Sequence, residues 1–117
     1  MKPLMIFVSG PYSALTIEER WGNVLVAVKA GIAIRAKGHY PIIPHLYDEF
    51  DEVAKLMGYN FDWQSYIDMD LAFLEKCDAL YFIGSSKGAD IEREHAKELG
   101  LQIFYSLDDV PDCGVRE

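Results

Sequence analysis

The sequence is short of cysteine, of positive charge and of long apolar runs, and each shortage excludes a class of protein. Cys77 and Cys113 are the only cysteines and form no C-x-x-C motif, so neither a disulfide framework nor a zinc site is indicated. The apolar run Leu4–Val8 is too short for a signal peptide or a membrane span. We therefore expect a cytoplasmic protein that carries free thiols and has no membrane partner.

The charge balance narrows the choice of ligands. With 11 Lys and Arg against 19 Asp and Glu, the formal net charge is -8. A nucleic-acid polymer is bound through a clustered basic surface, which this composition does not support. A mononucleotide is compatible with it, because backbone N–H groups at the start of a helix can hold one phosphate.

The length of 117 residues suits one hydrophobic core and is too short for two, so we expect a single domain spanning residues 1–117. The sequence contains no repeat, linker or low-complexity tract. Short apolar runs, typical of buried parallel strands, alternate with patterns of helical period. The predicted strands are 3–9, 39–43, 78–83 and 101–105, and the predicted helices are 17–37, 49–57, 62–76 and 89–99.

This alternation predicts an α/β fold of the flavodoxin-like (Rossmann-type) kind, a three-layer sandwich around a parallel sheet of four or five strands. Pro41 lies inside the second predicted strand and cannot donate to a ladder, which indicates an edge strand. The strand order 2-1-3-4(-5) satisfies that requirement. Residues 106–117 are expected to hold either a short fifth element or a tail.

The first predicted helix opens with the capping-box pattern Thr16–Glu19 and ends before Gly38. Four large apolar residues recur along it at helical spacing. They are Trp21, Leu25, Val28 and Ile32.

Ligands of such sheets bind beyond the carboxyl ends of strands 1 and 3, where the chain reverses direction. Ser9, Gly10 and Tyr12 follow the first strand, and Ser86 and Gly88 follow the third. The second of these loops leads into a helix and offers hydroxyl and N–H groups to an anion. Neither loop carries a Walker A or a G-x-G-x-x-G motif, and no cofactor is predicted.

Asp70 occupies an unexpected place on the helix predicted over 62–76. Trp63, Ile67 and Leu74 define the buried stripe of this helix, and Asp70 falls on the same stripe. A buried carboxylate is costly unless it has partners. Asp70 therefore either pairs with a neighbouring loop or belongs to a functional site.

Glu92 shows the same anomaly on the helix predicted over 89–99, whose inner side carries Ile91, Ala96 and Leu99. One interpretation is a first-turn Glu that complements the helix dipole, which favours its ionised form. The other is that Glu92 and a second carboxylate lean into one cleft. Glycosidases that retain configuration use such a pair, one carboxylate as nucleophile and the other to handle the proton.

The three histidines show no metal-ligand spacing, and no metal site is predicted. His45 follows Pro44 at the carboxyl end of the second strand and is the candidate to line the cleft. His39 is expected to be structural or exposed, and His95 is expected to pack.

Four segments carry a family pattern in a fixed order. They are S-G-P-Y at 9–12, G-H…P-H at 38–45, D-L-x-x-L-x-x-C-D at 70–78 and S-x-G-x-x-x-E at 86–92. In this order they resemble the nucleoside 2-deoxyribosyltransferase-like family, which includes deoxynucleoside 5'-monophosphate N-glycosidases. The resemblance extends from Ile6 to about Tyr105.

The resemblance implies a role for each carboxylate. Glu92 matches the nucleophile that attacks C1' and forms a glycosyl-enzyme intermediate. Asp70 matches the second carboxylate, which assists departure of the base or holds the sugar. Members of the family are commonly homo-oligomers, so a homodimer or a higher homo-oligomer is expected.

The remaining site residues follow from the same resemblance. Ser86 and Gly88 match the loop beside the 5' end of the substrate, Ser9 and Gly10 match the loop that faces it, and His45 falls in the region near the base.

Position 7 departs from the family pattern. Active members often carry a Tyr three residues before the first-loop Gly, and its hydroxyl bonds the catalytic Glu; this sequence has Phe7. Tyr12 is the candidate for a replacement donor. Two hypotheses follow. One is an enzyme that cleaves or transfers the N-glycosidic bond of a (deoxy)nucleoside or its 5'-monophosphate. The other is a non-catalytic nucleotide-binding or assembly domain of the same fold.

Overall fold

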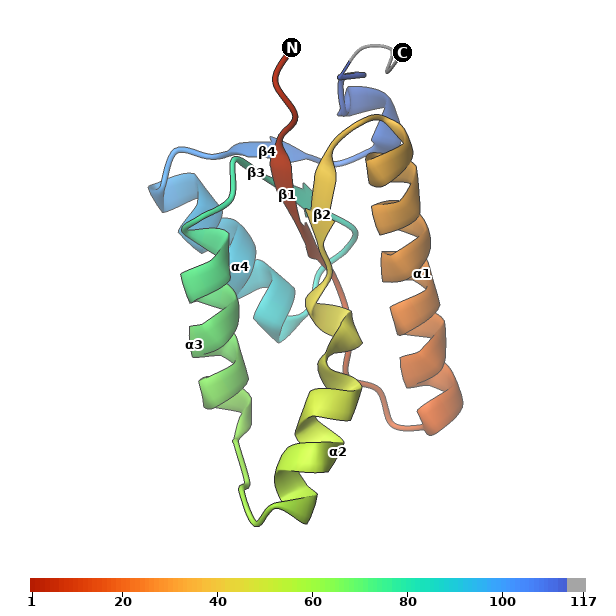
Figure 1. Cartoon of the computed structure of the whole chain (residues 1–117), viewed down its shortest axis with the longest axis vertical. Helices are drawn as coiled ribbons and strands as arrows, with labels where there is room; N and C mark the ends of the chain where they lie inside the picture. Colours follow the sequence, from red (N-terminus) through yellow and green to blue (C-terminus); the bar gives the residue numbers. More distant parts are fainter. Residues whose placement is uncertain (114–117) are drawn as a thin grey trace.

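The computed structural model describes residues 1–113, which form an α/β sandwich (Figure 1). Its strands are β1 (Met5–Ser9), β2 (Tyr40–Ile42), β3 (Ala79–Phe82) and β4 (Gln102–Phe104). Its α-helices are α1 (Ile17–Ala36), α2 (Asp48–Leu56), α3 (Trp63–Leu74) and α4 (Lys87–Glu98). Two short 3-10 helices are η1 (Pro44–Tyr47) and η2 (Leu107–Asp109).

The sheet is parallel and has the order β2-β1-β3-β4, which confirms the predicted flavodoxin-like arrangement. In the central strand, Ile6 lies opposite Pro41 on one side and Ala79 on the other. Pro41 therefore sits on an edge strand, as its missing N–H requires. Within residues 1–113 no fifth strand follows β4, and the chain turns into η2 instead.

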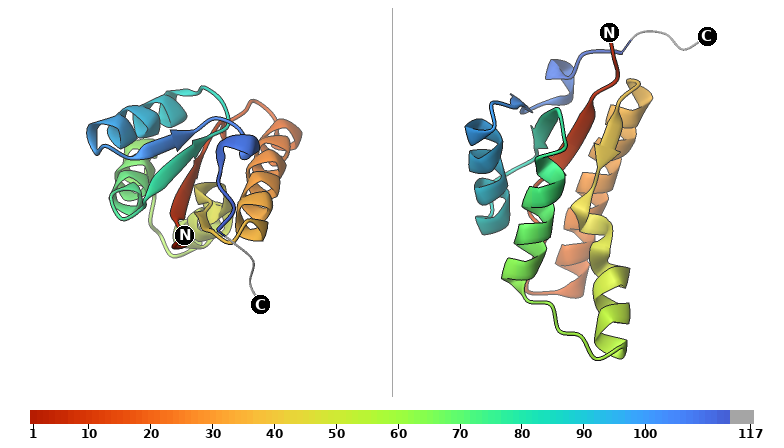
Figure 2. Two further views of the ribbon diagram at one scale, coloured as in Figure 1. Left: turned by 90° about the horizontal axis from the view of Figure 1, so that it is seen from above. Right: turned by 60° about the vertical axis from the view of Figure 1, so that its left-hand side comes forward.

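Helices cover both faces of the sheet, with α1 on one face and α3 and α4 on the other (Figure 2). Successive side chains of β1 alternate between these faces because a strand has a period of two. Ile6 and Val8 pack in the core cluster with α1, whereas Phe7 packs with Leu74 of α3 and Ala96 of α4. The same alternation sends the side chain of Ser9 to the α3 and α4 face.

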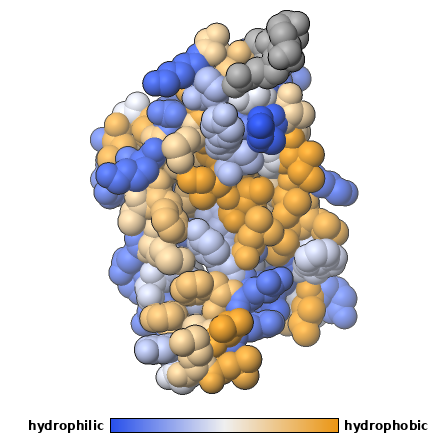
Figure 3. Space-filling view, viewed as in Figure 1, coloured by the Kyte–Doolittle hydropathy of each residue, from blue (hydrophilic) through white to orange (hydrophobic). Residues whose placement is uncertain are grey.

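The side of α1 that faces the sheet is made of small and medium side chains. The buried residues are Val24, Ala27, Ala30, Gly31 and Ile34. The helix lies so close to β2 that a Cβ on Gly31 would come within 2.4 Å of Ile43. The predicted apolar series is therefore on the outside: Trp21 is 58% exposed and Ile32 is 63% exposed. Apolar side chains reach the surface over α1 and around the tip of α2 (Figure 3).

Residues 110–113 are fastened to the end of α1 and the start of β2. The Cys113 N–H donates to Lys37 O (2.8 Å), and Lys37 Nζ donates to Val110 O (3.0 Å). His39 is fully buried between them: its Nδ1 accepts from the Leu4 N–H (3.0 Å), and its Nε2 donates to Pro111 O (2.6 Å). His39 is thus structural.

Both cysteines are buried free thiols. Burial raises the pKa of Cys77 to about 11, with the charge of Asp78 adding to the effect, and its Sγ donates to Phe73 O (3.4 Å). Cys77 therefore packs as an apolar side chain and does not act as a nucleophile. None of the helices within residues 1–113 combines the length and the apolar character that crossing a membrane demands.

Gly38 gives the first test of this packing. It ends α1 with a φ of +98°, and a Cβ there would lie 2.7 Å from the Cβ of Cys113. We expect Gly38→Ala to lower the free energy of unfolding by about 2–4 kcal/mol, because backbone strain and overpacking add. Gly100→Ala is the matched control: its φ is +75° but nothing lies within 4 Å, so only the strain, about 1 kcal/mol, is expected. Urea unfolding measures both values. Equal losses would show that the contact with Cys113 contributes nothing.

Candidate active site

A cleft of about 580 Å³ opens at the carboxyl ends of β1 and β3. The loop after β1, η1, α2, α3 and the start of α4 surround it. Seven of the eight predicted site residues line it: Gly10, Tyr12, His45, Asp70, Ser86, Gly88 and Glu92. The eighth, Ser9, is fully buried behind the wall and bonds Glu92. The structure therefore brings all eight residues to one place.

Glu92 projects from α4 and is 6% exposed. Ser86 caps this helix by accepting from the Ala89 N–H (3.1 Å), so α4 begins at Lys87. Glu92 therefore lies in the second turn and not in the first, beyond the range in which the helix dipole acts strongly. Burial raises the pKa of Glu92 to about 8, against the lowering effect of a hydrogen bond that Ser9 Oγ donates to Oε1 (2.7 Å). The expected stabilisation of the ionised form by the dipole is thus outweighed.

Asp70 projects from α3 toward the same point and is 8% exposed. Ile67 and Leu74, one turn before and after it, are buried as the stripe predicts, whereas Trp63 is 40% exposed at the rim. Burial raises the pKa of Asp70 to about 6, and a hydrogen bond with Glu92 acts in the opposite direction. Its Oδ1 has no hydrogen-bond partner among residues 1–113 although it is buried.

The two carboxyl groups influence each other's ionisation, and each holds its proton to a higher pH than a carboxyl group in water. Each has a raised pKa because it is removed from water, and the charge and hydrogen bond of Asp70 raise that of Glu92 further. Two carboxylates in contact cannot both ionise near neutrality without a large repulsion. At neutral pH the pair therefore carries one proton and one negative charge. One oxygen is available as a nucleophile while the other group holds the proton.

Close packing of α3 against α4 brings the pair together. A Cβ on Gly88 would come within 3.2 Å of Ile67 Cδ1, so a small residue at position 88 lets the start of α4 approach α3. Ser85, which precedes the cap, donates to both carboxylate oxygens of Asp90 (2.9 and 2.8 Å). The loop before α4 is thereby fixed, and with it the position of Glu92.

The hydroxyl that bonds Glu92 comes from residue 9 and not from residue 7. Phe7 is fully buried, and Ser9 projects from the same face of β1, two residues nearer the cleft. Ser9 supplies the hydrogen bond to Glu92, in place of the expected Tyr12. Tyr12 instead lies with its ring edge-on to His45, at 5.8 Å between centroids.

His45 is buried and neutral. Burial lowers its pKa, and the carbonyl groups of Pro11 and Gly10 act in the opposite direction. Nε2 donates to Pro11 O (2.9 Å), which leaves Nδ1 as an acceptor. Within residues 1–113 this Nδ1 has no partner. His45 thus holds the first loop against η1 and lines the cleft.

Sequence reasoning missed the wall that α2 and the start of α3 contribute. Asp51 joins the two helices, accepting from Tyr66 Oη (2.5 Å) and pairing with Lys55 (2.9 Å). The hydrogen bond from Tyr66, followed by that from Lys55, lowers the pKa of Asp51. The signal was present as an Asp and a Lys four residues apart on one face of a helix.

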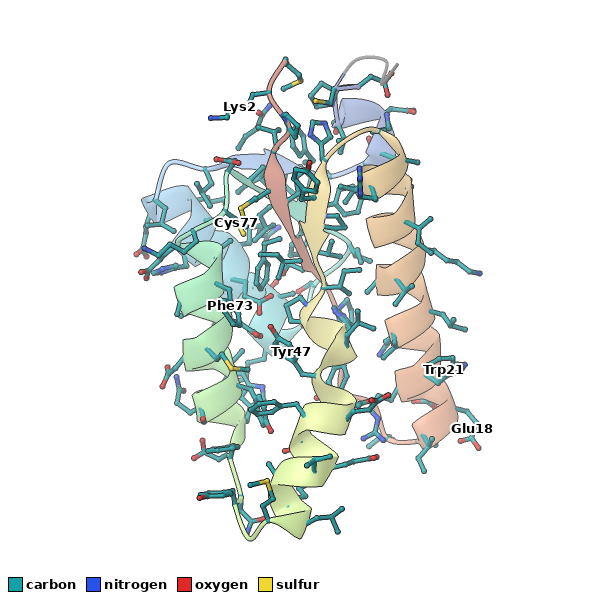
Figure 4. The ribbon with its side chains drawn as sticks, in the orientation of Figure 1. Lys2, Glu18, Trp21, Tyr47, Phe73 and Cys77 are labelled. Atoms are coloured by element: carbon teal, nitrogen blue, oxygen red, sulfur yellow. The ribbon has the colours of Figure 1, made fainter. Side chains whose placement is uncertain are left out.

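The rim of the cleft carries cations and aromatic rings. Lys87 Nζ lies 4.4 Å from the ring centroid of Trp63, and Arg20 reaches the cleft from α1. Tyr47 and Phe73 face each other between η1 and α3, 6.3 Å apart (Figure 4). Burial raises the pKa of Tyr47, with a contribution from the charge of Asp70. The cleft thus combines flat apolar surfaces with charges of both signs.

The predicted burial of other residues near the end of α4 is confirmed for Ala96 and wrong for Leu99. Ala96 is buried as predicted, but Leu99 is 42% exposed because the helix ends at Glu98. His95 pairs with Glu75 at the surface (3.0 Å). Within residues 1–113 no group of three or more His, Cys, Asp or Glu side chains has a metal-binding arrangement.

A family model described as a domain of unknown function (DUF4406) matches residues 5–105. No curated protein matches the chain.

The shared proton predicts how stability depends on pH. The pKa of Glu92 is raised from 4.5 to about 8, so its contribution is complete below pH 4.5 and is lost as the pH rises through 8. Glu92→Gln removes this loss. We subtract the free energy of unfolding of the unaltered chain from that of the Glu92→Gln variant. This difference should increase by about 2 kcal/mol or more between about pH 5 and pH 9.

Thermal unfolding across that pH range measures the difference. Glu94→Gln is the matched control, because Glu94 is an exposed residue two positions further along α4. Parallel curves for Glu92→Gln and the unaltered chain would rule out a raised pKa at Glu92.

Proposed function

The chain belongs to the DUF4406 family, a domain of unknown function, and we propose that it cleaves or transfers the N-glycosidic bond of a (deoxy)nucleoside or its 5'-monophosphate. The observation that carries this proposal is the buried Glu92–Asp70 pair, oriented by Ser9 at the bottom of one cleft. The resemblance to nucleoside 2-deoxyribosyltransferase-like proteins is part of the proposal.

The shared proton suits a two-step displacement. The pKa values favour the proton on Glu92, so the reactive form is the minor one in which Asp70 carries it, and in that form an oxygen of Glu92 attacks C1' of the sugar. The Glu92–C1' bond forms as the C1'–N bond breaks, and the leaving base takes both the electron pair and the proton of Asp70. In the second step water or another base attacks C1', the Glu92–C1' bond breaks with its electron pair returning to the Glu92 carboxylate, and Asp70 receives the proton of the attacking group. Hydrolysis and transfer differ only in this acceptor.

The walls of the cleft support a nucleoside-sized ligand. Trp63 and Tyr47 offer flat surfaces for a base, and burial of the reacting centre excludes bulk water. At the start of α4, Ser86 and Lys87 lie where a 5'-phosphate meets the helix N-terminus. Ser9 and Ser85 are committed to Glu92 and Asp90, so they do not serve that phosphate.

The second candidate is a nucleotide-binding or assembly domain without turnover. Two observations favour it. Phe7 lacks the hydroxyl that active nucleoside 2-deoxyribosyltransferase-like proteins often carry at this position, and burial raises the pKa of Glu92 to about 8. In that case the cleft binds its ligand and releases nothing.

Two further statements belong to the proposal and rest on the resemblance and the composition. The chain acts as a homodimer or a higher homo-oligomer, and it works in the cytoplasm, where Cys77 and Cys113 stay reduced.

The enzyme hypothesis is tested by incubating the protein with a panel of nucleosides, deoxynucleosides and their 5'-monophosphates and measuring free base by chromatography. We expect release of base that falls about 1,000-fold or more in Glu92→Gln and about 10-fold in Ser9→Ala. Glu94→Gln and Asp68→Asn, exposed neighbours on the same two helices, are expected to keep full activity.

Binding without release from any member of the panel would overturn the enzyme hypothesis in favour of the second candidate. Release that survives in Glu92→Gln would remove Glu92 from the role of nucleophile.

The pH profile tests the division of labour within the pair. We expect kcat/KM to be bell-shaped, with limbs at about pH 6 and about pH 8. Below the lower limb a second proton neutralises the nucleophile, and above the upper limb the pair has no proton to give to the base. Asp70→Asn should lose the upper limb. A flat profile between these values would refute the shared proton as the source of the acid.

A further inference from the structure

The outer face of α1 carries a regular apolar stripe. Its positions repeat at alternating spacings of three and four residues, the pattern of a helix-packing seam. The apolar positions are Trp21, Leu25, Val28 and Ile32. The same spacing continues to Glu18 before them and to Arg35 after them. Trp21 is 58%, Leu25 37% and Ile32 63% exposed, and Glu18 and Arg35 are exposed as well. Figure 4 shows Glu18 and Trp21 along α1, away from the sheet.

Within residues 1–113 most of this stripe is uncovered, and Val28 is its half-buried position. The core side of α1, occupied by Ala27, Ala30 and Ile34, lies about a third of a turn around the helix. Beside Trp21, Gly22 lies in the middle of the helix with nothing within 4 Å of the place where its Cβ would be. A helical Gly costs about 1 kcal/mol relative to Ala, and no contact inside the described chain accounts for it. A neighbouring backbone that approaches α1 closely would account for both the exposed stripe and the Gly.

The stripe of one copy is complementary to the stripe of a second copy that runs in the opposite direction. The centre of α1 falls between Val26 and Ala27, and the stripe positions are placed symmetrically about it. In an antiparallel pair of α1 helices, Trp21 of one copy meets Ile32 of the other. Leu25 likewise meets Val28. A two-fold axis at the centre therefore buries all four apolar positions of both copies in one continuous seam.

The charges at the two ends of the stripe select the antiparallel arrangement. Glu18 stands before the apolar positions and Arg35 after them, so reversal places each Glu18 opposite an Arg35. A parallel arrangement would place like charges together. Within residues 1–113 neither side chain has an ion-pair partner, although the Arg35 guanidinium lies over the ring of Tyr40 at 5.1 Å.

We infer that α1 is a self-association surface through which two copies of this chain form an antiparallel, two-fold symmetric dimer. Trp21 is its largest anchor, since buried Trp residues carry a large share of interface energy. Gly22 lets the two helix backbones approach, and the Glu18–Arg35 pairs fix the direction. The inference rests on α1 alone and is independent of the chemistry of the cleft.

Sedimentation velocity over a dilution series of the full chain measures the dissociation constant of the dimer. The expected result is a dimer at micromolar concentration. Leu25→Asp or Ile32→Asp buries an unpaired charge in the seam, and each should raise the dissociation constant about 100-fold or more. Leu56→Asp is the matched control: Leu56 is 87% exposed on α2, outside the seam, and its replacement should leave the constant unchanged.

Charge reversal tests the direction of pairing. Glu18→Arg and Arg35→Glu each create two like-charge contacts across the axis and should each raise the dissociation constant about 10-fold. The double variant E18R/R35E restores both pairs and should return the constant to within about three-fold of the starting value. Circular dichroism confirms that each variant is folded.

A monomeric chain at micromolar concentration overturns the inference. So does a dimer whose dissociation constant is the same in Leu25→Asp as in the unaltered chain, because that dimer uses another surface. Single reversals that weaken the dimer while the double variant fails to restore it would overturn the antiparallel arrangement.

Discussion

The burial of the Asp70 and Glu92 carboxyl groups in one cleft is the constraint around which the site is arranged. Two acidic side chains are withdrawn from water, each is bracketed by apolar neighbours on its own helix, and a proton held between them makes the arrangement tolerable. The approach of α3 to α4 and the hydroxyl at the end of β1 serve that arrangement. Such a pair lowers the stability of the empty protein, which is a cost typical of functional sites.

Much of the fold follows from local rules that the sequence states clearly. Pro41 forces β2 to an edge, apolar runs without alternation require a sheet covered on both faces, and caps such as Thr16 mark where helices begin. The direction in which α1 faces could not be predicted this way. This helix is apolar on several sides, and its largest side chains point outward because the sheet leaves room only for residues such as Ala27 and Gly31.

The candidate site was predictable in its members and not in its electrostatics. Asp70 and Glu92 can be identified from the sequence because they are acidic residues on otherwise apolar helix stripes. Their pKa values depend on burial and on their mutual contact, which no spacing along the chain encodes. The start of α4 also differs by two residues from the predicted start at residue 89. A helix that begins at Lys87 has Glu92 in its second turn, where the helix dipole has little influence on the carboxyl group. The contribution of α2 depends on the tertiary path between η1 and α3, which the spacing of Asp51 and Lys55 does not reveal by itself.

The hydrogen bond from Ser9 to Glu92 illustrates how strand geometry decides which side chains reach the cleft. Side chains two residues apart on β1 share a face, so a donor can move along the strand in steps of two and still reach the same acceptor. A step of one would deliver it into the opposite core layer, among Val8 and the helix behind it. Phe7 and Ser9 thus belong to one face of β1, an apolar side chain followed by a buried hydroxyl.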